Sequence, residues 1–150
     1  MKDKYILTAE SVTAGHPDKL CDTIADNVLD ACLKEDPNAR VACEVLATAG
    51  KILVAGELRT TASPDVEAIV RQTVRNAGYD CNYNVEVRLH TQSPDIAGAV
   101  DGDTLGAGDQ GIMYGYACWE TVELLPAPVV LANRITSLLT TCREEKLISG

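Results

Sequence analysis

Three side chains between Gly15 and Lys19 could together act on a phosphorylated ligand. His16 can donate a hydrogen bond to an oxyanion, Asp18 can ligate a hard cation such as Mg²⁺, and Lys19 can neutralise phosphate charge. The segment lies at the predicted start of a helix, where backbone N–H groups and the positive end of the helix dipole favour anions. A capped helix start with incidental charges explains the same residues, so this segment alone leaves both interpretations open.

A second candidate is the glycine-rich segment Gly106–Gly111. It lacks the Gly-Lys-Ser/Thr ending of a P-loop, and it is not a strand-led G-x-G-x-x-G motif. The end of a flexible loop would have the same composition. Because His16 and His90 are the only histidines, no persuasive Ser-His-Asp or Cys-His arrangement can be assembled, and we do not expect the protein to supply a nucleophile.

Two glutamates are candidates for a cation site in a predicted hairpin over residues 40–60. Strand-like alternation surrounds Gly50-Lys51, a pair suited to a two-residue type II′ turn. That turn places Glu44 directly opposite Glu57, a destabilising pair of like charges unless a cation lies nearby. A turn one residue longer would offset the glutamates, and both could instead simply reach solvent. The other face of the hairpin is apolar, with Val45, Ala47, Val54 and Leu58.

Helices and a further strand are expected to position these groups. Apolar residues recur at helical spacing from Pro17 to Lys34. A second helix is predicted with Ser63 as N-cap, Pro64 at the first helical position and Gly78 at its end. Residues 84–91 alternate as a half-buried strand.

The later part of the chain begins with an aperiodic, glycine-rich stretch over residues 93–111. Long loops of this kind often close over active sites, although plain disorder fits the composition as well. Residues 112–118 could form another strand, and Pro128 opens a helix to about Lys146. The apolar stripe of this last helix predicts that a covering surface is supplied elsewhere.

Composition limits the class of protein. The 150 residues, 46% of them hydrophobic, suffice for one globular core. Neither a membrane-spanning segment nor a secretory signal is evident, so we expect a cytoplasmic protein without a membrane partner. The six cysteines have neither C-x-x-C nor zinc spacing and are expected to be reduced and buried. A net charge of -9 argues against nucleic-acid binding and implies that an anionic substrate would need metal ions.

Several segments together resemble the S-adenosylmethionine synthetase family. Any one of them is a weak match, whereas four in the family's order and nearly its spacing are specific. The similarity continues to residue 128 and covers essentially the whole chain. The segments are Glu10–Lys19, Arg40–Glu44, Gln92–Ile96 and Gly106–Gly111, followed by Met113–Ala117 and Leu125–Pro128.

The resemblance implies an α+β fold, with helices packed on a mixed or antiparallel sheet. It implies the family's N-terminal domain over residues 1–92, a gating loop over 93–106, and the incomplete start of the central domain over 107–150. These would be the first of the family's three similar units and the opening of the second. The loop is several residues shorter than is usual in the family, which places its gating role in question.

The family joins methionine sulfur to the 5′ carbon of ATP and hydrolyses the departing tripolyphosphate to phosphate and diphosphate. The resemblance therefore implies a methionine adenosyltransferase with ATP and L-methionine as ligands. It also implies Mg²⁺ and K⁺ as cofactors and a homodimer or homotetramer. The family's later part supplies lysines, an arginine and aspartates that this chain lacks.

The resemblance assigns roles to individual residues. His16 would be catalytic, contacting the triphosphate near the breaking bond, and would share the ATP site with Glu10 and Lys19. Asp18 would bind Mg²⁺ and Glu44 would bind K⁺. The methionine ligands would be Glu57, Gln92 and Asp109.

The chain is expected to be an incomplete piece of this enzyme, and two alternatives are open. The chain could be a non-catalytic methionine- or nucleotide-binding module, or one half of a split enzyme. A chain with a single plausible phosphate lysine cannot readily neutralise a triphosphate. Residues 1–150 alone are therefore expected to be inactive.

Overall fold

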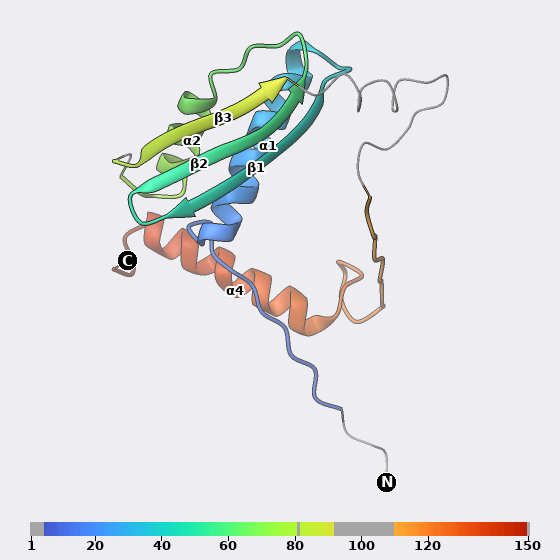
Figure 1. Cartoon of the computed structure of the whole chain (residues 1–150). Coiled ribbons are helices and arrows are strands. Elements are labelled where there is room, and N and C mark those ends of the chain that lie inside the picture. The colour runs from blue at the N-terminus through green and yellow to red at the C-terminus, as the bar shows by residue number, and fades with distance from the viewer. Residues whose placement is uncertain (1–4, 81, 92–109, 150) are drawn as a thin grey trace. The chain divides into compact units, whose positions relative to one another are not determined.

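The computed structural model describes residues 5–80, 82–91 and 110–149. The chain forms two compact units: the sheet unit, Gly15–Gly111, and the helix unit, Met1–Ala14 with Ile112–Gly150. Figure 1 shows the elements of both units. They are α1 (Pro17–Glu35), β1 (Arg40–Thr48), β2 (Lys51–Arg59), α2 (Val66–Asn76), β3 (Asn84–Thr91) and α4 (Ala127–Glu144).

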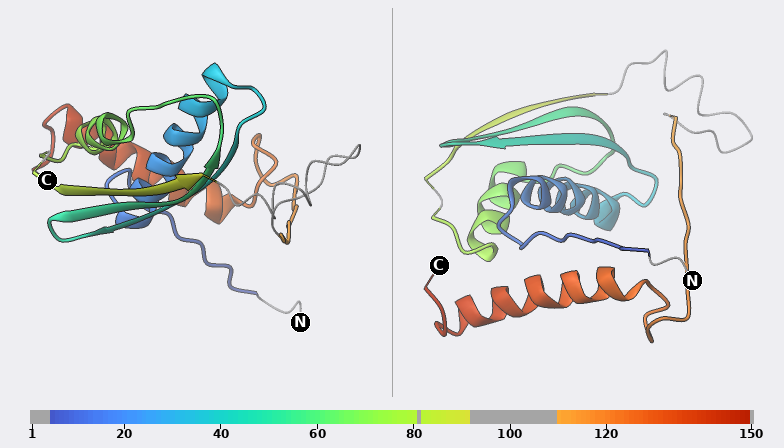
Figure 2. Two further views of the ribbon diagram at one scale, coloured as in Figure 1. Left: turned by 45° about the horizontal axis from the view of Figure 1, so that its top comes forward. Right: turned by 90° about the horizontal axis from the view of Figure 1, so that it is seen from below.

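The sheet unit is a layer of two helices on a three-stranded mixed sheet. The strand order is β1-β2-β3, with β1 antiparallel and β3 parallel to β2. A parallel neighbour requires a crossover connection, and α2 provides it. The right-hand view in Figure 2 shows α1 and α2 on the same side of the sheet. The predicted α+β fold and mixed sheet are confirmed.

The core lies between the helices and the inner face of the sheet. Alternate residues of β2 are buried, and helical spacing brings one stripe of each helix against them. The boundaries predicted for α1 and β3 are confirmed to within one residue. Fully buried side chains from the three elements form the centre: Ile24, Val28, Ile52, Val54, Val70 and Val74.

The hairpin turn lies one residue earlier than predicted. Thr48 pairs with Lys51, so the central turn residues are Ala49 and Gly50. Gly50, with φ of 73°, occupies the second central position, where a type II turn requires a positive φ, and not the first position of a type II′ turn.

This shift changes the pairing of the two glutamates. Glu44 lies opposite Ala55 and Glu57 lies opposite Ala42, so their predicted direct opposition is wrong. Because side chains two positions apart share a face, the glutamates are still diagonal neighbours on one face, with a typical separation of roughly 7–8 Å.

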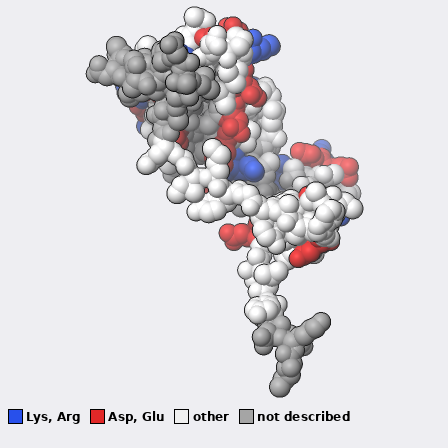
Figure 3. Space-filling view, turned by 90° about the vertical axis from the view of Figure 1, so that its right-hand side faces the viewer, with Lys and Arg blue, Asp and Glu red and all other residues white. Residues whose placement is uncertain are grey.

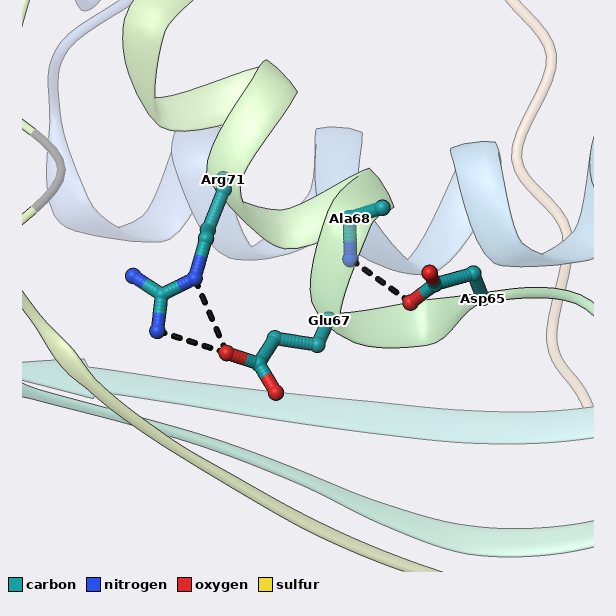
Figure 4. A network of polar contacts seen from close by, with 4 residues as sticks. All are labelled: Asp65, Glu67, Ala68 and Arg71. Atoms are coloured by element: carbon teal, nitrogen blue, oxygen red, sulfur yellow. Dashed lines mark hydrogen bonds and ion pairs between the residues drawn. The ribbon is translucent and has the colours of Figure 1, made fainter.

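The cap of α2 also differs from the prediction. Asp65, and not Ser63, is the N-cap residue, and its Oδ1 accepts a hydrogen bond from the Ala68 N–H at 3.0 Å (Figure 4). Its negative charge suits the positive end of the helix dipole. One turn further, Arg71 Nε and Nη2 both donate to Glu67 Oε1, at 2.9 and 2.6 Å.

The helix unit contains α4, close to its predicted range, and an extended N-terminal segment. Ser11 Oγ lies 3.1 Å from Thr136 Oγ1 of α4. The predicted strand over residues 112–118 is wrong, because a strand needs a hydrogen-bonded neighbour and the described part of this unit contains none. No described helix is both long and apolar enough to cross a membrane.

The conformation of Gly56 predicts a strong stability effect. Its φ is 142°, and a Cβ there would lie 2.0 Å from the Ala42 carbonyl oxygen. We expect Gly56→Ala to lower the free energy of unfolding by about 3 kcal/mol or more, since strain and a backbone clash add. Gly50→Ala is the control: open space surrounds Gly50, so only its positive φ is penalised, by about 1 kcal/mol. Equal losses in urea titrations would contradict this account.

Asp36 predicts a pH dependence of stability. Its Oδ2 accepts hydrogen bonds from the Thr61 N–H at 2.8 Å and the Thr60 hydroxyl at 3.0 Å, and its Oδ1 accepts one from the Asn38 N–H at 3.0 Å. These contacts, the Thr61 N–H first, hold the pKa of the Asp36 carboxyl below its ordinary value.

A folded-state pKa below the unfolded value means that the stabilisation is present above the ordinary aspartate pKa, about 3.9, and is lost as pH falls through the folded value. We therefore expect Asp36→Asn to flatten the acid limb of the unfolding midpoint against pH. Asp30→Asn, at an exposed position of α1, removes the same charge and should leave that limb unchanged. Parallel changes in both variants would refute the role of Asp36.

Candidate functional site

His16 begins α1 as its N-cap residue. Its backbone is extended, with φ of -63° and ψ of 136°, and its carbonyl accepts the Leu20 N–H at 2.8 Å. The imidazole Nδ1 accepts the backbone N–H of Asp18 at 3.2 Å. A neutral imidazole that accepts at Nδ1 carries its proton on Nε2. The cap therefore leaves Nε2–H as the donor of His16.

Asp18 and Lys19 occupy the first turn of α1 beside this ring. The Asp18 side chain is 91% exposed, with Oδ2 4.0 Å from His16 Nδ1. Lys19 is also exposed. The structure thus brings three predicted site residues together at the end of a helix whose dipole favours anions. A ring donor, a carboxylate and an ammonium group are available there within one helical turn.

Glu44 and Glu57 lie on the outer face of the sheet, opposite the face covered by α1 and α2. Across the strands, Glu57 lies between Ala42 and His90, while Ala55 separates Glu44 from Arg88. The Arg88 Nε donates to Glu86 Oε1 at 2.9 Å, and Lys51 Nζ pairs with Glu86 at 2.5 Å. These hydrogen bonds and charges, Lys51 first, lower the pKa of Glu86.

The other predicted site residues lie elsewhere in the chain. Glu10 is exposed and belongs to the helix unit. Gln92 and Asp109, the remaining predicted methionine ligands, lie outside the described residues. Among described residues the structure therefore groups His16, Asp18 and Lys19 at one helix end and Glu44 and Glu57 on one sheet face.

The described candidates for metal ligands are isolated carboxylates and do not form a cluster. Within residues 5–80, 82–91 and 110–149, no three His, Cys, Asp or Glu side chains form a group that could hold a metal. Asp18 and Glu44 each offer exposed carboxylate oxygens, the donor type that hard cations such as Mg²⁺ prefer. Each residue fits the role of one ligand among several.

A pocket beside the α1 N-terminus contains residues that the sequence analysis did not identify. It has a volume of about 410 Å³. Two tyrosines contribute to it, and Tyr79 donates from Oη to the Gly15 carbonyl oxygen at 2.9 Å. The only signal for Tyr79 in the sequence is its place directly after the helix-ending Gly78. The lining residues are Gly15, Pro17, Leu20, Ala47, Thr48, Ala49, Tyr79 and Tyr83.

The described cysteines are free thiols, of which Cys32 is buried and Cys21, Cys43, Cys118 and Cys142 are partly buried. Burial is the largest cause that raises the pKa of Cys21, Cys32 and Cys43. A thiol with a raised pKa stays protonated at neutral pH, and the thiolate is the reactive form.

Acidic side chains outnumber basic ones in this chain, which gives it a net charge of -9. Figure 3 shows several groups of them on one side of the molecule, with basic side chains among them. An anionic ligand would meet repulsion over such a surface, except where cations or a helix N-terminus offset it. The first turn of α1 combines a helix N-terminus with a lysine.

Comparison with known proteins matches both parts of the chain to one family. Residues 4–102 match the family model "S-adenosylmethionine synthetase, N-terminal domain", and residues 104–149 match "S-adenosylmethionine synthetase, central domain". These matches cover nearly the whole sequence.

Three relatives, each named S-adenosylmethionine synthase, illustrate the similarity. The protein of a Sulfurovum species is 48% identical over 96% of this chain, and that of a Nitratiruptor species is 46% identical over 99%. The Prochlorococcus marinus protein is 46% identical over 97%. The chain spans about 40% of the length of these relatives. The chain belongs to the S-adenosylmethionine synthetase family.

Proposed function

We propose that this chain is the N-terminal portion of a methionine adenosyltransferase. The whole enzyme would form S-adenosylmethionine from ATP and L-methionine and release phosphate and diphosphate. One observation carries the proposal: within a chain of this family, His16, Asp18 and Lys19 share one exposed helix N-terminus. That arrangement offers a polyphosphate two donors, the imidazole and the ammonium group, together with a carboxylate for its metal ion.

The first turn of α1 would bind the triphosphate of ATP. The Lys19 ammonium group would neutralise phosphate charge, and His16 would donate from Nε2 to an oxygen near the breaking bond. Asp18 would hold Mg²⁺, and Glu10 would complete the nucleotide site. When bound, Mg²⁺ supplies positive charge that stabilises the departing tripolyphosphate.

The outer face of the sheet would contribute to the methionine side of the site. Glu57, with Gln92 and Asp109, would bind methionine, whose ammonium group is a suitable partner for carboxylates. Glu44 would ligate K⁺. The diagonal placement of Glu44 and Glu57 supports this proposal, because two carboxylates on one face are stabilised by positive charge between them.

The proposed organisation follows the family. Residues 1–92 would form the N-terminal domain, residues 93–106 the gating loop, and residues 107–150 the start of the central domain. The enzyme would act in the cytoplasm as a homodimer or homotetramer. In α4, Leu131, Ile135 and Leu138 are all more than half exposed, which supports a covering surface supplied elsewhere.

A second candidate function follows from the charges at the α1 N-terminus. Within the first turn of α1, Lys19 is the one lysine beside the proposed phosphate site, and the chain has a net charge of -9. A methionine- or nucleotide-binding module without turnover, or one half of a split enzyme, would fit these observations.

Complementation tests the proposal. We expect no product from the purified chain with ATP, methionine, Mg²⁺ and K⁺, because one lysine cannot neutralise a triphosphate. Adding a polypeptide with the part of the Sulfurovum relative that this chain does not match should restore S-adenosylmethionine formation. Lys19→Ala should lower the restored rate roughly 100-fold, whereas Lys34→Ala, at the other end of α1, should not.

The outcomes of this experiment separate the two candidate functions. Binding of ATP or methionine without product, even after complementation, would favour the binding module. Turnover by the chain alone at the restored rate would overturn the expectation that it is incomplete. Neither binding nor product in any mixture would reject both functions.

Variants of His16 separate its capping role from its proposed chemistry. Asparagine keeps a side-chain acceptor for the cap but removes the ring donor, and alanine removes both. We expect His16→Ala to lose about 1 kcal/mol of stability and His16→Asn much less. Both should weaken binding of Mg-tripolyphosphate, measured by titration calorimetry. Unchanged binding by His16→Asn would show that the imidazole is not needed.

A further inference from the structure

The end of α2 directs Tyr79 out of the helix. Gly78 has a φ of 89°, its N–H donates to the Arg75 carbonyl at 2.9 Å, and the Tyr79 N–H donates to the Val74 carbonyl at 3.2 Å. This pair of bonds around a left-handed glycine is the Schellman arrangement of a helix end. The position of the Tyr79 backbone is thereby tied to the last turn of α2.

The Tyr79 side chain reaches the residue that precedes His16. Its Oη donates to the Gly15 carbonyl at 2.9 Å, although the two residues are 64 positions apart in the chain. The ring also lies close against Gly15, since a Cβ there would be 2.7 Å from Oη and 2.9 Å from Cε2. Tyr79 thus contacts Gly15 in two ways, by a hydrogen bond and by filling the space that a side chain would need.

These contacts restrain the backbone on both sides of His16. On the N-terminal side, the peptide between Gly15 and His16 is held through its carbonyl oxygen by Tyr79. On the C-terminal side, the His16 carbonyl accepts the Leu20 N–H at 2.8 Å. With both adjoining peptides held, the imidazole can keep its 3.2 Å contact from Nδ1 to the Asp18 N–H.

We propose that Tyr79 is a positioning residue for His16. By holding Gly15, it keeps the imidazole in the capping orientation, in which Nδ1 accepts and Nε2 carries the proton toward an incoming ligand. A role of Tyr79 in catalysis rests on the proposed function, whereas the effect of Tyr79 on the His16 imidazole does not. Loss of one ordinary hydrogen bond changes a local equilibrium by roughly 2- to 12-fold, which is the size of effect expected here.

A purely structural role for Tyr79 predicts a different result. Tyr83 lines the same pocket and packs against the core, so removal of its hydroxyl tests whether any tyrosine there affects the ring. His90, the only other histidine, lies in β3 and serves as an internal reference. A general loss of packing would lower the melting temperature without a specific change at His16.

The test uses ¹⁵N-labelled chain without ligands. Two-bond ¹H–¹⁵N spectra, recorded where imidazoles are neutral, report which ring nitrogen carries the proton, and amide exchange reports the Asp18 N–H. We expect wild-type His16 to be protonated mainly at Nε2. Tyr79→Phe should mix the two tautomers and speed Asp18 amide exchange by roughly 2- to 12-fold. Tyr83→Phe should do neither, and His90 should not change in either variant.

A second variant covers the case in which Tyr79→Phe fails to fold. Gly15→Ala keeps the tyrosine but forces its ring away, so it should produce the same change at His16. The proposal is overturned if the folded variants leave His16 and Asp18 as in the wild type, or if Tyr83→Phe has the same effect.

A separate titration with Mg-tripolyphosphate tests the proposed function. Tyr79→Phe should weaken binding by no more than the roughly 2- to 12-fold change of the local equilibrium. If the wild type does not bind tripolyphosphate, the proposed phosphate site fails, while the ring spectra still decide the role of Tyr79.

Discussion

The apolar contact between the two helices and one face of the sheet is the constraint on which the sheet unit depends. Ile24 and Val28 of α1 are fully buried with Ile52 and Val54 of β2. Burial of each such side chain contributes about 1.5–3 kcal/mol. Because α1 and α2 pack on one face of the sheet, the charged residues of the opposite face, Glu44 and Glu57 among them, do not contribute to this core.

The same packing determines what surrounds the first turn of α1. Helix α2 lies against α1, with Asn27 Nδ2 donating to the buried Thr73 hydroxyl at 2.9 Å. Its C-terminal end therefore comes close enough for Tyr79 to bind the Gly15 carbonyl. The candidate phosphate site is thus supported by a helix distant in sequence, and its geometry depends on a contact that the site residues do not make themselves.

The pairing register of the β1–β2 hairpin could not be predicted from the sequence pattern alone. Alternation of polar and apolar residues correctly placed Glu44 and Glu57 on one face, because side chains in a strand alternate with a period of two. Which residues stand opposite one another depends on the turn. Gly50 suits either central position of a two-residue turn, the first in type II′ and the second in type II. The choice of Ala49-Gly50 moved the glutamates from opposed to diagonal positions, which lowers their mutual repulsion.

The amino-acid sequence was enough to predict the family, the α+β class, the ranges of α1 and β3, and the joint placement of His16, Asp18 and Lys19. These follow from local periodicity, capping and short motifs, which act within a few residues. The tertiary structure decided the hairpin register, the cap at Asp65, the absence of a strand over residues 112–118 and the contact of Tyr79 with Gly15. The missing strand and the Tyr79 contact depend on partners distant in the chain. The register and the cap depend on a local choice, because more than one residue was chemically suited to the turn and to the N-cap.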